Sequence, residues 1–82
     1  MRLEYDIAIN RNFFLSFMEQ NKVSENDLAQ LIGISHSMLN RVLNGKRNPG
    51  SKFIAGVLKN CKVNFEDAFY FEESLPKGNK AS

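Results

Sequence analysis

The sequence predicts an all-α domain made of five short helices. Apolar residues recur at spacings of three and four along most of the chain, which is the period of one helix face. Serine and asparagine, which cap the beginnings of helices, and glycine and proline, which end them, fall between the apolar segments. A chain of 82 residues, of which 43% are hydrophobic, has the size of one compact domain. The predicted helices cover residues 10–21, 24–32, 35–44, 51–60 and 65–71.

The first two predicted helices have clear boundaries. One face of the first helix carries an apolar row: Phe13, Phe14, Phe17 and Met18. The second helix begins with Ser24, and Asp27 follows at a spacing close to that of a capping box. Gly33 ends this helix, because glycine adopts the left-handed conformation that helix ends need and lets the chain turn sharply. A third helix is therefore expected directly after the turn.

The third predicted helix is polar on one side. Ser35 can cap its first turn. Its apolar face carries Leu39, Val42 and Leu43. The opposite face carries short hydrogen-bonding groups and one arginine: His36, Ser37, Asn40, Arg41 and Asn44. Such groups can read the edges of bases, because arginine binds guanine and asparagine binds adenine through paired hydrogen bonds.

Charge is unevenly distributed along the chain. Residues 28–65 contain six lysines and arginines and no carboxylate, which gives this segment a net charge of +6. Residues 1–27 hold three basic and five acidic residues, and residues 66–82 hold two basic and four acidic residues, so each flank sums to −2. This asymmetry indicates a polyanionic partner for the middle segment. The alternative is a solvated basic face without a partner.

The segment from about Asn10 to Tyr70 resembles the helix-turn-helix family of phage Cro and repressor proteins, also called the XRE family. The matching pattern is Leu28-Ala29-Gln30, then Gly33, then Leu39, then Leu43-Asn44-Gly45-Lys46. The spacing has a physical reason, because Ala29 must be small where the third helix crosses it and Gly33 makes the turn. The resemblance implies a five-helix lambda-repressor-like domain at residues 10–71, with an N-terminal arm at 1–9 and a flexible tail at 72–82.

Two features depart from the family pattern. Many members pair an arginine in the first helix with a glutamate late in the third, and Met18 and Leu43 occupy these places here. We expect an apolar contact between them, because replacing a buried ion pair with apolar groups removes a desolvation cost. Leu3, Tyr5 and Ile7 alternate with polar residues, which is the period of a strand. This strand can pair with an extended segment at 70–75, pair with its copy in a second chain, or remain an ordered arm.

The resemblance places the third helix in the major groove of double-stranded DNA. The residues expected at base edges are His36, Ser37 and Arg41, with Ser35 and Asn40 next in line. Arg41 is the first candidate, and a plain phosphate contact is the alternative role for it. His36 has no Cys or Asp partner at ligand spacing, which argues against a metal site, and it too can bind a phosphate. The residues expected to hold the DNA backbone are Ser24, Asn26, Asn44, Lys46, Arg47, Asn48 and Lys52.

The resemblance also implies a transcription regulator, most simply a repressor, that binds a palindromic operator as a homodimer. Phe65, Phe69 and Phe71 are the candidate apolar surface for that dimer. The alternative function is an antitoxin or another protein-binding module that uses the same fold and represses its own operon. The polar face of the third helix argues against a purely protein-binding role, because it lacks the exposed aromatic residues typical of an interface centre.

Other classes of protein are disfavoured by the residues that the sequence lacks. It contains no Ser/His/Asp or Cys/His set, no paired carboxylates on a common face and no Gly-rich phosphate loop, so we expect neither an enzyme nor a cofactor. No metal and no small-molecule ligand are expected. Cys61 is the single cysteine and is expected to be a small buried hydrophobe in a reducing compartment. Without a long apolar run or a signal-peptide core, the chain is expected to be cytoplasmic, encoded by a bacterium or a phage.

Overall fold

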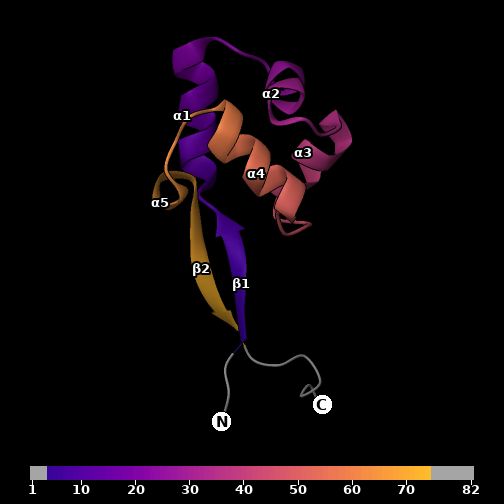
Figure 1. The fold of residues 1–82 in the computed structure, drawn as a ribbon. Helices are drawn as coiled ribbons and strands as arrows, with labels where there is room; N and C mark the ends of the chain where they lie inside the picture. Colours follow the sequence, from indigo (N-terminus) through magenta and orange to yellow (C-terminus); the bar gives the residue numbers. More distant parts are fainter. Residues whose placement is uncertain (1–3, 75–82) are drawn as a thin grey trace.

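The computed structural model describes residues 4–74 of the chain. Five helices gather into one body, and two strands form a ribbon that projects from one end of it (Figure 1). Among the described residues, no helix is both long enough and apolar enough to cross a bilayer. The elements in chain order are β1 (Glu4–Ile9), α1 (Arg11–Asn21), α2 (Glu25–Ile32), α3 (His36–Leu43), α4 (Ser51–Asn60), α5 (Phe65–Ala68) and β2 (Phe69–Ser74).

Local sequence signals set the boundaries of the first helices. The side-chain oxygen of Asn10 caps α1 by accepting a hydrogen bond from the backbone amide of Phe13 at 3.2 Å. Ser24 and Asp27 form the expected capping box at the start of α2, with hydrogen bonds of 3.1 and 3.3 Å. Gly33 ends α2 with a φ of 96°, a conformation in which any other side chain would be strained. The predicted capping box and the predicted turn are therefore confirmed.

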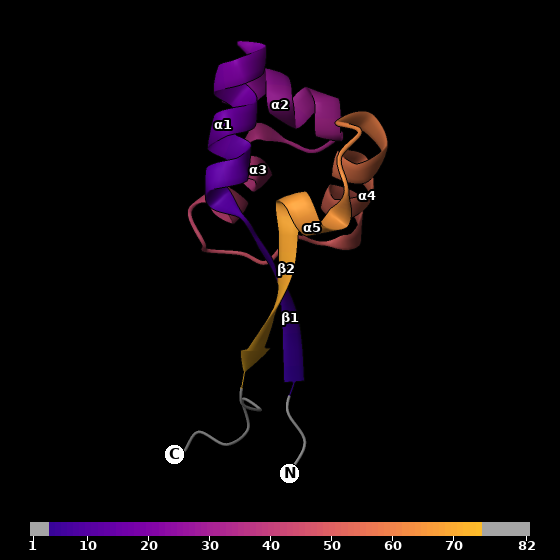
Figure 2. The ribbon, with the colours of Figure 1, turned by 90° about the vertical axis from the view of Figure 1, so that its left-hand side faces the viewer.

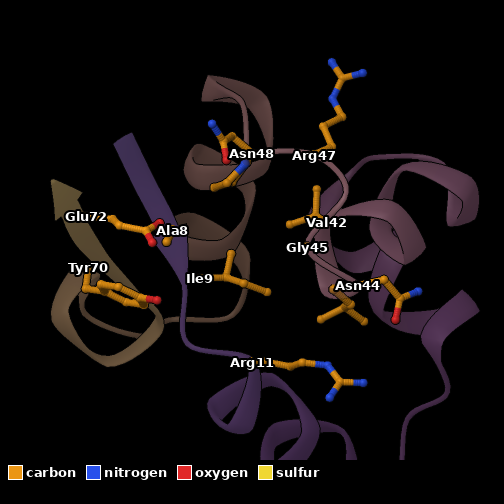
Figure 3. A pocket seen from close by; sticks show the side chains of 12 residues that line it. Ala8, Ile9, Arg11, Val42, Asn44, Gly45, Arg47, Asn48, Tyr70 and Glu72 are labelled. Atoms are coloured by element: carbon orange, nitrogen blue, oxygen red, sulfur yellow. The ribbon is translucent and has the colours of Figure 1, made fainter. Parts of the chain in front are cut away.

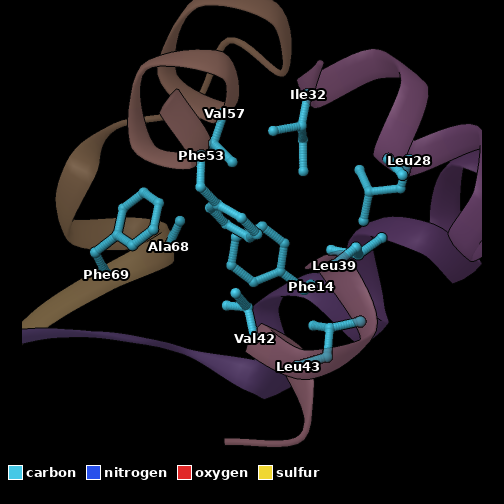
Figure 4. Packing of buried hydrophobic residues seen from close by; sticks show 11 residues of the cluster. Phe14, Leu28, Ile32, Leu39, Val42, Leu43, Phe53, Val57, Ala68 and Phe69 are labelled. Atoms are coloured by element: carbon cyan, nitrogen blue, oxygen red, sulfur yellow. The ribbon is translucent and has the colours of Figure 1, made fainter. Parts of the chain in front are cut away.

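Three phenylalanines form the centre of the core (Figure 4). Phe14 of α1, Phe53 of α4 and Phe69 of β2 are fully buried. Their ring centroids lie 5.9, 6.1 and 6.2 Å apart in edge-on pairs, each of which contributes about 0.5–1.5 kcal/mol beyond the area that it buries. Around them α2 and α3 contribute Leu28, Ala29, Ile32, Leu39, Val42 and Leu43. Met18 is partly buried against this cluster, and its direct contact with Leu43 stays a prediction.

The helices α2 and α4 cross in close contact at Gly56. A β-carbon at this position would overlap the backbone carbonyl oxygen of Ile32. Glycine inside a helix costs about 1 kcal/mol relative to alanine, and the close crossing accounts for its use here. The side-chain amide of Asn60 also donates to the backbone oxygen of Leu31 at 2.9 Å. These contacts hold α4 against the end of α2, next to the turn that leads into α3.

The strand predicted near the N-terminus is present, and it pairs within the chain. β1 runs antiparallel to β2, with Ile7 opposite Phe71 and Ile9 opposite Phe69. Of the alternatives that the sequence leaves open, pairing with the extended C-terminal segment is the one observed. The all-α prediction is therefore confirmed for the five helices and incomplete at the two ends of the domain, which form a small sheet.

Two predicted boundaries at the C-terminal end need correction. The sequence predicts a fifth helix at 65–71, whereas α5 ends at Ala68 and the backbone becomes extended at Phe69. Packing is the reason, because the ring of Phe69 joins the core and the backbone oxygen of Ala68 accepts a hydrogen bond from the amide of Asn10 at 2.8 Å. Residues 72–74, which the sequence assigns to a flexible tail at 72–82, belong to β2 instead. Residues 75–82 lie outside the described part of the chain.

Cys61 lies at the C-terminal cap of α4. It is partly buried against the core, and this burial raises the pKa of its thiol. The thiol therefore stays protonated near neutral pH and acts as a small apolar side chain.

Candidate nucleic-acid interface

The candidate interface is built by α2, the turn at Gly33 and α3. Leu39, Val42 and Leu43 anchor α3 in the core, so the opposite side of this helix faces solvent. The hydroxyl oxygen of Ser35 accepts a hydrogen bond from the backbone amide of Met38 at 3.1 Å and so caps α3 as predicted. The helix is thus fixed at its first turn and along its apolar face, while its polar side remains open.

All the residues predicted to contact bases lie at the beginning of α3 or on its open side. These exposed residues are Ser35, His36, Ser37, Asn40 and Arg41. The oxygen of Ser35 accepts the capping hydrogen bond, so its O–H donor and its second lone pair remain for a ligand. Within residues 4–74, no carboxylate forms an ion pair with Arg41, so its guanidinium donors are available.

Glu25 is a candidate functional residue that sequence reasoning missed. Its carboxylate oxygen lies 3.0 Å from Nε2 of His36, and both side chains are partly exposed. This hydrogen bond joins the first turn of α2 to the first turn of α3. A carboxylate can only accept, so Nε2 carries the proton, and Nδ1 accepts in a neutral imidazole or donates in a protonated one. The two residues are 11 positions apart, and only the turn at Gly33 brings them together.

Asn40 is held by Asn44, one helical turn later. The side-chain amide of Asn44 donates to Oδ1 of Asn40 at 3.1 Å. Asn40 keeps its own N–H donors and a second lone pair on Oδ1, which are the groups that adenine recognition uses. Asn44 is predicted as a phosphate contact, but its amide is directed at Asn40, which is predicted to contact a base. Its spacing from Asn40, which is typical of side-chain pairs on a helix, is the signal in the sequence that indicates this role.

The segment after α3, residues 44–50, is the exit loop. Gly45 adopts a φ of 73°, and the backbone amide of Lys46 donates to the carbonyl oxygen of Arg41 at 2.9 Å, so the loop folds back onto the end of α3. The exit loop and the first turn of α4 expose four of the predicted phosphate contacts: Lys46, Arg47, Asn48 and Lys52. The structure therefore gathers three cations and one amide at one end of α3.

The remaining predicted phosphate contacts lie at the start of α2, in a less favourable setting. Ser24 and Asn26 are both exposed, but Glu25 and Asp27 alternate with them. The hydroxyl oxygen of Ser24 already accepts a hydrogen bond from the amide of Asp27. The two carboxylates compensate the positive end of the helix dipole and repel a phosphate. We therefore expect the exit loop to hold the DNA backbone more strongly than the start of α2 does.

An open pocket of about 510 Å³ lies between the ribbon and the exit loop (Figure 3). Arg11, the first residue of α1, lines this pocket together with Asn44 and Arg47. In the sequence, Arg11 belongs to the acidic N-terminal flank. Folding brings it next to the basic exit loop, so Arg11 is a second candidate residue that sequence reasoning missed.

A helix pair whose second helix exposes hydrogen-bonding side chains beside a basic loop defines the helix-turn-helix class of DNA-binding domain. Sequence comparison agrees, because the profile of a helix-turn-helix family matches residues 16–67. The chain belongs to the XRE-type helix-turn-helix family. It is 44% identical over 66 residues to YvzC of Bacillus subtilis (strain 168), described as an uncharacterized HTH-type transcriptional regulator, and the match covers 80% of this chain and 86% of that protein. No solved structure matches the chain.

Proposed function

We propose that this protein is a sequence-specific transcription regulator that binds double-stranded DNA and acts as a repressor. The open side of α3 carries the proposal, because side chains suited to reading bases lie there beside the cations of the exit loop. Family membership and the similarity to a transcriptional regulator of B. subtilis support it. In this proposal α3 enters the major groove and the exit loop lies along the phosphate backbone.

The base contacts divide along α3. Arg41 donates to O6 and N7 of a guanine, a contact that discriminates against other bases by about 1–3 kcal/mol. Asn40 reads an adenine through the groups that Asn44 leaves free. The bases beneath the first turn of α3 are contacted by Ser35, His36 and Ser37. The order of these contacts along α3 determines which base sequence the protein prefers in each half-site.

Phosphate contacts fix the position of α3 without reading sequence. The exit loop and Lys52 provide the main contacts, and Arg11 adds a cation from the other wall of the pocket. Ser24 and Asn26 contribute less, because carboxylates lie beside them. Each cation that neutralises a phosphate releases counterions, so affinity for every DNA sequence falls as salt rises.

A single domain of this size covers only one half-site, because a helix in the major groove reaches a few base pairs. We therefore propose a homodimer on a palindromic operator whose half-sites lie about 34–36 Å apart, one turn of the double helix. A dimer that occupies such an operator excludes RNA polymerase from an overlapping promoter, which is the simplest route to repression. The protein would act in the bacterial cytoplasm, where its operator lies.

Selection of bound duplexes from a random pool of double-stranded DNA, followed by sequencing, tests this proposal. The wild-type protein should enrich a palindromic motif, and Arg41→Ala should lose preference at one position in each half-site. Arg47→Ala and Arg11→Ala are matched controls, because they remove the same side chain from proposed phosphate contacts and should weaken binding to all sequences alike. If the wild-type protein enriches no motif at any salt concentration, α3 does not read bases and the proposal fails.

A further inference from the structure

The ribbon of β1 and β2 has two sides of different chemistry. Residues directly opposite each other in an antiparallel pair point to the same side, and side chains alternate along each strand. Tyr5, Ile7 and Phe71 therefore share one side, the apolar face, on which Tyr5 is 58% and Phe71 is 65% exposed. Glu73 lies on this side as well, opposite Tyr5, and its carboxylate accepts a hydrogen bond from the Tyr5 hydroxyl at 3.4 Å. The opposite side carries the other three carboxylates, those of Glu4, Asp6 and Glu72. Figure 2 shows that the ribbon stands clear of the helices.

The apolar face continues the hydrophobic core outward. Phe65 links the two, because its ring centroid lies 5.2 Å from that of buried Phe69 and 5.5 Å from that of exposed Phe71. The sequence groups these phenylalanines as a candidate dimer surface, and the structure corrects that grouping, because Phe69 belongs to the core. An exposed apolar patch that is continuous with the core is typical of a protein contact surface.

Charge limits what can cover this face. Residues 4–9 and 69–74 hold four carboxylates and no lysine or arginine, so DNA and anionic membranes are repelled. Asp6 lies directly opposite Glu72, and like charges in that arrangement weaken strand pairing. A two-stranded ribbon is also only marginally stable by itself. The ribbon therefore gains stability from an apolar protein surface placed against it.

We propose that a second copy of this chain covers the apolar face, so that two ribbons pack face to face in a two-fold dimer. A two-fold interface needs a patch that complements itself. The apolar face meets this need around Ile7 and Phe71, because three of the ribbon's four carboxylates lie on the opposite side and the fourth, Glu73, lies at the outer end of the face beside Tyr5. The ribbon projects from the end of the body while α3 lies on its flank, so the dimer leaves α3 open to DNA (Figure 1). This inference rests on the proposed function, in which a palindromic operator requires two domains.

The size of the ribbon predicts a weak dimer. Its strands have six residues each. At about 3.4 Å per residue, with two strands about 4.8 Å apart, the apolar face covers roughly 200 Å². A stable interface buries about 800 Å² on each partner. The ribbon is therefore the centre of an interface that neighbours such as Phe65 enlarge, and the free protein should exchange between monomer and dimer.

Sedimentation equilibrium of the full chain over a wide range of concentrations tests this surface. The wild-type protein should dimerise reversibly, and Phe71→Ser should raise the dissociation constant of the dimer at least about tenfold, because aromatic anchors carry much of an interface's binding energy. Tyr70→Ser is the matched control and should leave this constant unchanged. Tyr70 is the adjacent residue of β2, is 50% exposed and points to the opposite side of the ribbon. Circular dichroism shows whether both variants keep the fold.

DNA binding separates this inference from the proposed function. Phe71→Ser should bind a duplex with one half-site as tightly as wild type does, and should lose cooperativity between two half-sites. A wild-type protein that stays monomeric at every concentration and fills two half-sites independently would overturn the dimer and leave DNA reading intact. If Phe71→Ser and Tyr70→Ser raise the dissociation constant of the dimer by the same factor, the apolar face is not the interface. A different protein that co-purifies with wild type and is lost from Phe71→Ser would overturn the second copy as the occupant. A dimer that binds no DNA would contradict the proposed function alone.

Discussion

The helix α3 and the ribbon present opposite surfaces to solvent. α3 and the exit loop expose cations and hydrogen-bonding groups, and neither segment contains a carboxylate. The ribbon exposes aromatic rings and four carboxylates, and neither of its strands contains a cation. A polyanion is attracted to the first surface and repelled by the second. Charge therefore divides the molecule into a side suited to nucleic acid and a side suited to another protein.

Both surfaces depend on the same core. Leu39 and Val42 hold α3 to it, and Phe69 holds the base of the ribbon. Phe14 and Phe53 lie between them, and their rings pack against that of Phe69. A substitution in the core should therefore damage both surfaces, whereas a substitution on either surface should damage only that one.

The largest expected effect is the loss of the ring that anchors the ribbon. Phe69→Ala should lower the free energy of unfolding by about 3–5 kcal/mol, because it empties a fully buried site. Phe71→Ala, two residues further along β2, should cost under about 1 kcal/mol, because this ring is mostly exposed. Urea denaturation at one dilute protein concentration, where the monomer dominates, measures both values. Similar losses in the two variants would mean that the core and the apolar face are not separate regions.

The regions also differ in how far the sequence predicts them. The helix-turn-helix follows from local signals, since capping at Ser24 and Ser35, the turn at Gly33 and the apolar period of α3 each lie within a few residues. The boundary between α5 and β2 does not follow from such signals. Phe65 and Phe69 have helical spacing, whereas Phe69 and Phe71 have the spacing of a strand, so both periods are present in one short segment. Packing of Phe69 in the core and pairing with β1 decide between them.

The candidate site shows the same limit. Periodicity is enough to place His36, Asn40 and Arg41 on one exposed side of α3. It cannot reveal Glu25 or Arg11, because each reaches the site only through tertiary packing. Local charge sums assign both residues to an acidic flank, although folding places Glu25 beside His36 and Arg11 across a pocket from Arg47. The roles of these residues in DNA binding stay predictions.

An intermediate effect is expected from the pair of asparagines on α3. Asn40→Ala should weaken binding to the selected operator by about 1–3 kcal/mol, because it removes a paired contact to a base. Asn44→Ala should cost less, and the double variant should cost no more than Asn40→Ala does, because Asn44 acts by holding Asn40 at 3.1 Å. Affinity measurements on operator DNA complete this double-mutant cycle. Additive losses would instead support the phosphate contact that the sequence predicts for Asn44.

The smallest expected effect concerns Glu25, where two consequences have opposite signs. Glu25→Gln removes a negative charge next to the DNA and should tighten binding to non-specific duplexes. It should also weaken the hold on His36 and so reduce discrimination at the base pair beneath that residue, by about 1 kcal/mol or less, the usual strength of an exposed pair. Affinities for operator and scrambled duplexes at fixed salt measure both quantities.

A matched control separates the two consequences of Glu25→Gln. Glu66→Gln makes the same change of charge on α5, which lies on the side of the body away from α3 (Figure 1). This control should leave discrimination between duplexes unchanged. If Glu25→Gln tightens binding to operator and scrambled duplexes by the same factor, Glu25 only repels phosphate and does not position His36. If Glu25→Gln raises non-specific affinity and lowers discrimination between duplexes, the Glu25 carboxylate both weakens the attraction to DNA and orients His36.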